Sequence, residues 1–457
     1  MDLKEKRVLV VGLGRSGVAS AVFLKSRGAR VTVSDARSED QLREEIPALL
    51  DQGIAVETGG HGERTFHNQD LIVVSPGVPI DSPPLAQARA MGASVIGEIE
   101  LASQFVRGRI VAITGSNGKT TTTTLIGEIL AKSGLKTLVG GNIGTPAISL
   151  VIEAASETAI VLEVSSFQLE TIRTFRPKIA VVLNITPDHL DRHRTFAAYV
   201  DAKARIFENQ TSDDFAVLNA DNPACVELAA RTRAQVFWFS RKGEVEQGAF
   251  VRKTQIAFRR GHSDIEVIPV AEVPLKGGHN IENVLASICA AVLMGCDAAR
   301  IRPAVREFKA VEHRLEYVAT VQGVEYYNDS KATNVDATVK ALESFPANVH
   351  VILGGKDKGS DYTLLNDLLR ERVKCVYTIG AAAEKIRSQI DGAAAVVSSG
   401  TIESAVRQAT AAARPGDIVL LAPACASFDQ FQNYEHRGRV FKELVRALAL
   451  ESSVDQG

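Results

Sequence analysis

A turn rich in glycine, with lysine and threonine at its end, follows the apolar run at residues 110–113 and precedes a helical pattern that ends near Ser133. Its residues Thr114, Gly115, Ser116, Asn117, Gly118, Lys119, Thr120 and Thr121 are small or polar apart from the lysine. Small residues let backbone N–H groups surround phosphate oxygens, Lys119 neutralises their charge, and the Thr120 hydroxyl can bind Mg²⁺. The first glycine of the full P-loop pattern would fall on Ile113, yet the strand-turn-helix context predicts phosphate binding. Neither Asn-Lys-x-Asp nor Asp-x-x-Gly occurs, which favours ATP over GTP.

The first glycine-rich turn along the chain, Gly12-x-Gly14-x-x-Gly17, follows the apolar run 8–11, and Asp35 follows the next predicted strand. Glycine is needed there because a Cβ would obstruct the tight turn and the approach of a diphosphate to the helix N-terminus. An acidic residue after the second strand suits a ribose hydroxyl, so this motif alone predicts a nicotinamide or flavin enzyme. A closely packed turn without a ligand is the alternative.

A carboxylate and a histidine end two further predicted strands. Glu163 follows the run 159–162, and His189 follows the run 180–186 and Asp188. Mg²⁺ prefers oxygen ligands, so we expect Glu163 to bind it, whereas His189 could equally cap a helix. Lys203 lies in the predicted helix 195–208, where a lysine is normally solvated, and the residues themselves give it no role.

Three polar loops, each at the end of a predicted strand, are rich in lysine and hydroxyl groups. They are residues 328–334, 354–358 and 423–430. The carboxyl ends of parallel strands meet at one edge of a sheet, so these loops predict a site for a small anion. Loops are polar in any case, and an ordinary solvated surface is an equal alternative.

Short β-branched runs alternate with helical patterns along almost the whole chain. The clearest runs are 7–11, 29–33, 71–74, 110–114, 159–164, 180–185, 349–353, 373–379 and 417–421. Continuous apolar strands separated by amphipathic helices are typical of parallel sheets covered on both faces. The predicted fold class is therefore α/β.

The length of 457 residues corresponds to about three domains. The two glycine-rich turns each open a nucleotide-binding fold, so we expect one boundary near Gly97 and another near Ala310. The predicted domains are 1–97, 98–310 and 311–457, with an antiparallel insert at 237–274. The third opens with a hairpin of strands 315–321 and 324–327 that turns at Gly323, and residues 452–457 are expected to be disordered.

Composition excludes several classes of protein. The 52 basic and 54 acidic residues give a net charge of −2, which argues against a nucleic-acid or polybasic membrane partner. No apolar run approaches the roughly 18 residues of a membrane span, and the run 8–11 is expected to be a strand and not part of a signal peptide. Five cysteines without a Cys-x-x-Cys pair predict a reducing, cytoplasmic setting.

Taken together, the motifs resemble the Mur ligase family, the ATP-dependent amide-forming enzymes of bacterial cell-wall synthesis. The segments that carry the resemblance are 115–120, 141–144, 163–169, 184–192, 278–280, 312–314, 328–334 and 423–431. Segments 328–334 and 423–431 are similar to the branch that adds D-glutamate. The resemblance implies a Rossmann-like first domain, a P-loop ATPase-like central domain and a Rossmann-like third domain.

The resemblance also assigns ligands. It implies that the first glycine turn holds the uridine diphosphate of a substrate and not NAD, through Gly14, Arg15, Ser16, Asp35, Arg37, Ser75 and Gly77. It implies that Asn142, counted with the residues that bind the UDP-linked substrate, touches the ATP or substrate side of the central site. It implies that residues 115–121, Asn280, Arg314 and Asp329 hold ATP. It implies that D-glutamate is held by Lys331, Thr333, Lys358, Ser427, Phe428 and Tyr434, the last of which stands where the family often has phenylalanine.

By the same resemblance, Lys203 is carbamylated by CO₂ and becomes an oxygen ligand, which an ammonium without a lone pair could not be. Two Mg²⁺ ions are then expected, one on Thr120 and Glu163 and one on His189 and carbamylated Lys203. Lys119, Glu163, His189 and Lys203 are the expected catalytic residues. The implied reaction passes through an acyl phosphate that the amine of D-glutamate attacks.

The substrates that the resemblance implies are UDP-N-acetylmuramoyl-L-alanine, D-glutamate and ATP. The protein is expected to act in cytoplasmic peptidoglycan precursor synthesis, and so in cell shape and cell division. We expect it to be a monomer without a nucleic-acid or membrane partner. Three alternatives stay open. They are another Mur or folylpolyglutamate-type ligase, an NAD-dependent oxidoreductase that uses Asp35, and a non-catalytic nucleotide-binding module.

Overall fold

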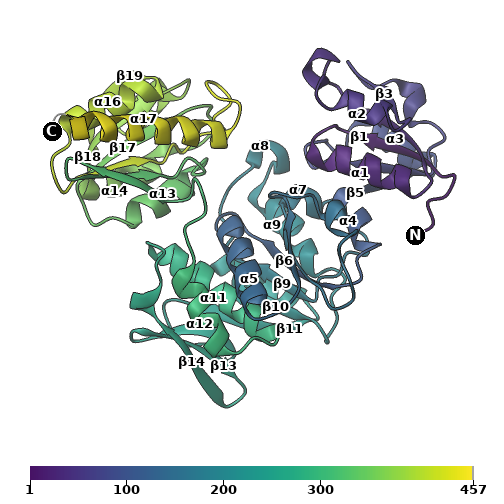
Figure 1. Cartoon of the computed structure of the whole chain (residues 1–457), viewed down its shortest axis with the longest axis horizontal. Helices are drawn as coiled ribbons and strands as arrows, with labels where there is room; N and C mark the ends of the chain where they lie inside the picture. Colours follow the sequence, from purple (N-terminus) through teal and green to yellow (C-terminus); the bar gives the residue numbers. More distant parts are fainter. Residues whose placement is uncertain (455–457) are drawn as a thin grey trace. The chain divides into compact units, whose positions relative to one another are not determined.

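Three separate β-sheets carry the architecture in the computed structural model, which describes residues 1–454 (Figure 1). They have five, nine and six strands, and helices connect most of the consecutive parallel strands. The predicted α/β fold class is confirmed. Disorder is predicted for residues 452–457. Of these, residues 455–457 lie outside the described residues, whereas residues 452–454 are helical, so the prediction is wrong for 452–454.

The first sheet is wholly parallel, in the order β3-β2-β1-β4-β5. Its strands are β1 Arg7–Val11, β2 Arg30–Ser34, β3 Ala55–Glu57, β4 Leu71–Val74 and β5 Ser94–Gly97. Its helices are α1 Arg15–Ser26, α2 Ile46–Leu50 and α3 Pro83–Ala90, followed by α4 Glu98–Ser103. The chain winds outward in opposite directions from β1 and β4, so a crevice forms where their carboxyl ends part.

The second sheet has the order β14-β13-β12-β11-β10-β9-β6-β8-β7. Its strands are β6 Arg109–Thr114, β7 Thr137–Gly141, β8 Ala159–Glu163, β9 Ile179–Val182, β10 Phe215–Asn219, β11 Gln235–Ser240, β12 Gly248–Arg252, β13 Gln255–Arg260 and β14 Ser263–Pro269. The helices between Thr114 and Glu307 are α5 Lys119–Lys132, α6 Ala147–Leu150, α7 Ser166–Leu169, α8 Leu190–His193, α9 Phe196–Ala204, α10 Pro223–Leu228, α11 Gly278–Leu293 and α12 Ala298–Glu307.

The antiparallel insert predicted at residues 237–274 is only partly correct. Strands β12 and β13 are antiparallel, but β11 pairs in parallel with β10, and β12 pairs in parallel with β11. Residue Phe237 is buried in β11. The segment therefore extends the main sheet, because its apolar alternation lets β11 and β12 continue the same hydrogen-bonded ladder.

The third sheet has the order β15-β16-β20-β17-β18-β19. Its strands are β15 Glu316–Val321, β16 Val324–Asn328, β17 Val349–Gly354, β18 Val373–Ile379, β19 Ala395–Gly400 and β20 Ile418–Leu421. Its helices are α13 Val335–Glu343, α14 Asn366–Arg372, α15 Ala383–Gln389, α16 Ile402–Ala412 and α17 Tyr434–Val454. The predicted hairpin is confirmed, since β15 and β16 are antiparallel and Gly323 has a φ of +77° at the turn.

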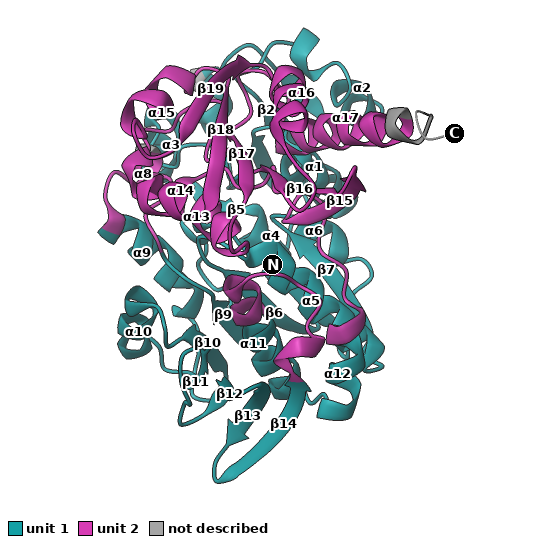
Figure 2. Ribbon diagram, turned by 90° about the vertical axis from the view of Figure 1, so that its left-hand side faces the viewer, with its two compact units in different colours: residues 1–185, 197–268, 284–304 teal, residues 186–196, 269–283, 305–457 magenta. Residues whose placement is uncertain are grey.

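The chain forms two compact units, coloured separately in Figure 2. Unit 1 contains Met1–Ile185, Ala197–Ile268 and Val284–Ala304, and unit 2 contains Thr186–Phe196, Pro269–Asn283 and Val305–Gly457. Within unit 2, Asn334 donates to the carboxylate of Asp188 at 2.9 Å, which ties segment 186–196 to the third sheet. Among the described residues, no helix combines the length and apolar character that a membrane span needs.

Glu98, the first residue of α4, is a buried acid of unit 1. One of its carboxyl oxygens accepts the N–H of Ile148 at 2.7 Å, and its side chain lies in the core. Burial raises its pKa from 4.5 to about 7, which hydrogen bonds from Ile148 and Ala147 only partly offset. The folded state therefore keeps the proton over a range in which the unfolded state has lost it.

Stability is expected to fall as pH rises from about 4.5 through 7, because over that range the folded state binds more protons than the unfolded state. Glu98→Gln should remove this loss and be more stable than the wild type above pH 7, by on the order of 3 kcal/mol at most. Thermal melts from pH 5 to 8 measure this, with Glu100→Gln as control.

Glu100 is a suitable control because its carboxylate accepts the N–H groups of Arg173, Thr174 and Phe175. Burial opposes ionisation of Glu100, but these hydrogen bonds outweigh it and lower its pKa. Glu100→Gln should therefore destabilise the protein at neutral pH. If the melting temperatures of the wild type and of Glu98→Gln change with pH in the same way, the assignment of Glu98 is contradicted.

Candidate functional site

A cavity of about 450 Å³ lies in the crevice where β1 and β4 end. Six of the predicted diphosphate-binding residues line it, namely Gly14, Arg15, Ser16, Asp35, Ser75 and Gly77. The turn is closely packed, since the Ser75 hydroxyl donates to the carbonyl oxygen of Gly12 at 2.8 Å, and a Cβ on Gly17 would lie 1.9 Å from that oxygen. The packing of the turn therefore requires glycine at position 17, whereas a Cβ on Gly14 would meet no atom within 4 Å.

Asp35 and Arg37 form one polar unit beside this cavity. The Asp35 carboxylate accepts the N–H of Leu13 at 2.6 Å, the N–H of Arg37 at 2.8 Å and the Arg37 guanidinium at 3.0 Å. Burial opposes ionisation, but the hydrogen bonds and charge of Arg37 lower the pKa of Asp35. The carboxylate thus fixes the first glycine turn and holds a half-exposed arginine next to the cavity.

The predicted phosphate loop is a tight turn between β6 and α5. Gly115 has a φ of +149° and Gly118 a φ of +85°, conformations that favour glycine. Asn184 holds the loop, because its carbonyl oxygen accepts the N–H of Ser116 and its side chain accepts the N–H of Asn117, both at 2.8 Å. The loop leads into the N-terminus of the 14-residue helix α5, which favours an anion.

Two lysines converge on this loop. Lys119 donates to the carbonyl oxygens of Gly115 and Ser116 at 2.8 Å, and Lys203 donates to the same Gly115 oxygen at 2.8 Å. Lys203 is only 1% exposed, so the expectation of a solvated surface lysine is wrong. The reason is tertiary, since α9 packs the face that carries Lys203 against the loop, which the composition of the helix does not reveal.

Tyr199 is a site residue that the motifs did not identify. Its ring lies 4.6 Å from the Lys203 ammonium, and its hydroxyl is 3.2 Å from that of Ser116. Tyr199 and Lys203 are four residues apart and therefore share one face of α9. That spacing was the available signal, but it indicates a site only once the phosphate loop is known to lie opposite.

Glu163, at the end of β8, is 2% exposed and is held by two neighbours. The Thr120 hydroxyl donates to one carboxylate oxygen at 2.8 Å, and the Asn142 amide donates to the other at 3.2 Å. Asn142 therefore lies beside the phosphate loop, in the central part of the chain. A carboxylate and a hydroxyl oxygen this close fit a hard cation such as Mg²⁺.

In the part of the chain that the structure describes, no three His, Cys, Asp or Glu side chains gather as a metal site. His189 belongs to unit 2, where its φ is +54° and its backbone N–H donates to Asp188 at 2.9 Å. Its side chain lies 3.7 Å from the Asp188 carboxylate.

The remaining predicted residues all belong to unit 2. They are Asn280, Arg314, Asp329, Lys331, Thr333, Lys358, Ser427, Phe428 and Tyr434. Lys331 lies 3.6 Å from the ring centroid of Tyr434, a cation–π contact, and its carbonyl oxygen accepts the N–H of Thr333 at 2.8 Å. Asn280 lies in α11, where its amide donates to the carbonyl oxygen of Lys276 at 2.7 Å.

Asp329 is partly buried and lies directly after β16. Its carboxylate accepts the N–H of Leu315 at 3.1 Å, and burial raises its pKa to about 6, an effect that the charge of Arg314 partly offsets. The structure therefore places Asp329 and Arg314 in one electrostatic environment. Ser427 is 1% exposed, whereas Phe428 beside it is 67% exposed.

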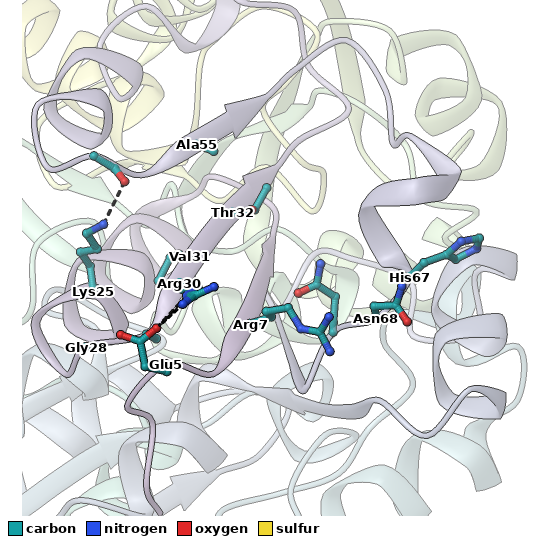
Figure 3. A pocket seen from close by; sticks show the side chains of 13 residues that line it. Glu5, Arg7, Lys25, Gly28, Arg30, Val31, Thr32, Ala55, His67 and Asn68 are labelled. Carbon is teal, nitrogen blue, oxygen red and sulfur yellow. Dashed lines mark hydrogen bonds and ion pairs between the residues drawn. The ribbon is translucent and has the colours of Figure 1, made fainter.

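A second cavity, of about 540 Å³, lies at the opposite edge of the first sheet (Figure 3). Its cations are already compensated, since Arg30 donates to Glu5 at 2.8 Å and Lys25 donates to the carbonyl oxygen of Gly53 at 3.0 Å (Figure 3). We therefore assign it no anion.

Comparison with known proteins gives matches along the whole chain. Residues 6–97 match the N-terminal domain of MurD-like Mur ligases, residues 113–291 the Mur ligase middle domain, and residues 313–425 the glutamate ligase domain of Mur ligases. The UDP-N-acetylmuramoylalanine–D-glutamate ligase of Koribacter versatilis is 67% identical over 98% of this chain and 99% of its own. The ligase of the same name from Acidobacterium capsulatum is 60% identical over 98% and 97%.

Among solved structures, the pseudomurein peptide ligase type C of Methanothermus fervidus has a TM-score of 0.62. The similarity covers 97% of this chain and 100% of that one, at 21% identity. At this level of identity the likeness supports the fold.

Proposed function

The chain belongs to the Mur ligase family, and on that premise we propose that it joins D-glutamate to UDP-N-acetylmuramoyl-L-alanine and converts ATP to ADP and phosphate. The observation that carries the proposal is the near full-length similarity to ligases named for D-glutamate addition. Family membership decides against the oxidoreductase and the non-catalytic module, since it gives the second glycine turn and the third sheet a role.

In the proposed reaction the substrate carboxylate attacks the γ-phosphate of ATP and forms an acyl phosphate. Both groups are anions, so their approach needs compensating charge. Lys119 and the N-terminus of α5 supply it at the phosphate loop, where the lysine exchanges its carbonyl partners for phosphate oxygens. The amine of D-glutamate then attacks the acyl carbon, and phosphate leaves.

Two Mg²⁺ ions are part of the proposal, and their role is to neutralise phosphate charge. Thr120 and Glu163 would hold one, which the 2.8 Å contact between their side chains supports. His189 and a carbamate on Lys203 would hold the other. The catalytic set is thus Lys119, Glu163, His189 and Lys203.

The contacts of Lys203 support its carbamylation. Two ammonium groups, those of Lys203 and Lys119, donate to one carbonyl oxygen inside a loop that must also bind an anion. Reaction of the Lys203 amine with CO₂ releases a proton and replaces one of these like charges by an anion. The opposite charge is then favourable beside Lys119 and supplies oxygen ligands.

The first cavity would take the uridine diphosphate, with Arg15 as its cation and Asp35 holding Arg37 at its edge. Asn142 would face the central reaction site, beside Glu163. Asn280, Arg314 and Asp329 would contact ATP. The cations Lys331 and Lys358 suit the two carboxylates of D-glutamate, and the remaining contacts would come from Thr333, Ser427, Phe428 and Tyr434.

We place the enzyme, as a monomer, in cytoplasmic peptidoglycan precursor synthesis, and so in cell shape and cell division.

A panel of amino acids tests the reaction. The purified protein, with UDP-N-acetylmuramoyl-L-alanine, ATP and Mg²⁺, is expected to release phosphate with D-glutamate and to give a product that carries one more glutamyl group. L-glutamate and L-alanine serve as controls, because L-glutamate changes only the configuration and L-alanine changes the side chain as well. Release with either control but not with D-glutamate would contradict the proposal and indicate another ligase of the family.

A further inference from the structure

The loops that follow β17 and β20 are joined through their backbones. The N–H of Gly354 donates to the carbonyl oxygen of Pro423 at 2.8 Å. Lys356 and Ala426 exchange a pair of hydrogen bonds, at 2.8 and 3.1 Å, and so form an isolated antiparallel bridge. One loop contains Lys358 and the other contains Ser427, two residues proposed to bind the amino acid.

A single side chain adds a second link between these loops. Tyr362 is completely buried, and its hydroxyl lies 2.8 Å from the carboxylate of Asp357 and 2.9 Å from the sulfur of Cys425. Asp357 directly precedes Lys358, and Cys425 lies two residues before Ser427. The tyrosine hydroxyl thus touches both loops next to the proposed binding residues.

The directions of these hydrogen bonds follow from charge. Burial opposes ionisation of Asp357, but hydrogen bonds from Lys385, at 2.7 Å, from Tyr362 and from the N–H of Ser360 outweigh it and lower its pKa. An ionised carboxylate can only accept, so the Tyr362 hydroxyl donates to it. Burial raises the pKa of the Cys425 thiol to about 11, so the thiol keeps its proton and donates to the tyrosine oxygen.

We propose that Tyr362 is a positioning residue for the amino-acid site, and that its hydroxyl sets the spacing between Lys358 and Ser427 by bonding Asp357 and Cys425. The proposal rests on the proposed function for the identity of the amino acid. The backbone bridge joins the loops at Lys356 and Ala426, and the Tyr362 hydroxyl adds a second link between Asp357 of one loop and Cys425 of the other. Because the site must hold its ligand to within a fraction of an ångström, we expect loss of this second link to lower affinity.

Tyr362→Phe removes one oxygen atom and tests the inference. The variant is expected to raise KM for D-glutamate roughly tenfold, the effect of about one lost hydrogen bond to a charged group, with KM for ATP and for the UDP-linked substrate unchanged. Combining Tyr362→Phe with Cys425→Ala should raise KM by less than the product of the two single effects, because both remove the same contact.

Tyr377→Phe is the matched control. Tyr377 is 1% exposed in β18 of the same sheet, and its hydroxyl lies 3.1 Å from Nδ1 of His350 and not at these loops. Tyr377→Phe should lower the melting temperature by about as much as Tyr362→Phe does, without changing KM for D-glutamate. The inference would be overturned if Tyr362→Phe changed KM equally for D-glutamate, ATP and the UDP-linked substrate. It would also be overturned if KM for the amino acid did not change.

Amide hydrogen exchange of the full-length protein gives a readout that does not depend on the reaction. The amides of Lys356 and Ala426 should exchange faster in Tyr362→Phe than in the wild type and in Tyr377→Phe. If the wild type uses another amino acid, the proposed function fails and the KM comparison is made with that amino acid. If the wild type uses no amino acid, hydrogen exchange alone tests the inference. Unchanged exchange rates at the amides of Lys356 and Ala426 would then overturn it.

Discussion

Replacing Lys119 by alanine is expected to lower kcat by about a hundred- to a thousandfold, because the variant loses the cation at the phosphate loop. Lys119 is the first residue of α5, and its ammonium lies within 2.8 Å of two carbonyl oxygens of the loop. That position is the one a phosphate oxygen would share. The fall in kcat should exceed any change in ATP affinity, because charge compensation matters most when the substrate carboxylate approaches the γ-phosphate.

Lys132→Ala is the matched control for this prediction. It removes the same charge from the same helix, but from the last turn of α5. The measurement is phosphate release at saturating substrates, with nucleotide binding determined separately by calorimetry. A Lys119→Ala enzyme that retains the wild-type kcat and shows only weaker ATP binding would contradict the role.

Lys203→Met is expected to lower kcat by at least about a hundredfold while leaving the melting temperature close to that of the wild type. Methionine has a similar length, and replacing a buried charged group by an apolar one of similar volume is often neutral for stability. Activity falls because methionine cannot form a carbamate and so removes the proposed oxygen ligand. The contrast between activity and stability separates this role from a structural one.

The carbamate itself can be observed. The wild-type protein in isotope-labelled bicarbonate should show a carbamate signal by carbon NMR that is missing in Lys203→Met. Lys119→Ala is an informative comparison, because it removes the neighbouring ammonium but keeps Lys203. Full activity of Lys203→Met, or a wild type without the signal, would contradict the assignment.

Much of the fold could be predicted from local patterns. Continuous β-branched runs marked strands such as β1, β4 and β18 at their observed bounds, since a strand buried on both faces must be apolar throughout. Glycine-rich turns marked where two of the sheets place their loops. The insert at 237–274 was harder, because alternation predicts a strand but not the direction of its neighbour.

Individual site residues divided in the same way. Lys119, Thr120 and Glu163 were identified because each follows the end of an apolar strand, and the structure brings all three to one turn. Lys203 was assigned only through the resemblance, since nothing local distinguishes a lysine that packs inward. Asn142 was likewise assigned only through the resemblance, and it lies beside Glu163.

The sequence by itself determined the strands, the two glycine turns and the resemblance to the family, because these depend on residue types that are close along the chain. Only the tertiary structure decided which distant side chains meet. It buried Lys203 against Gly115, and it joined the loops of Lys358 and Ser427 through the hydroxyl of Tyr362. Such contacts depend on how elements pack in space, and a pattern of local spacing carries no record of the partner across the interface.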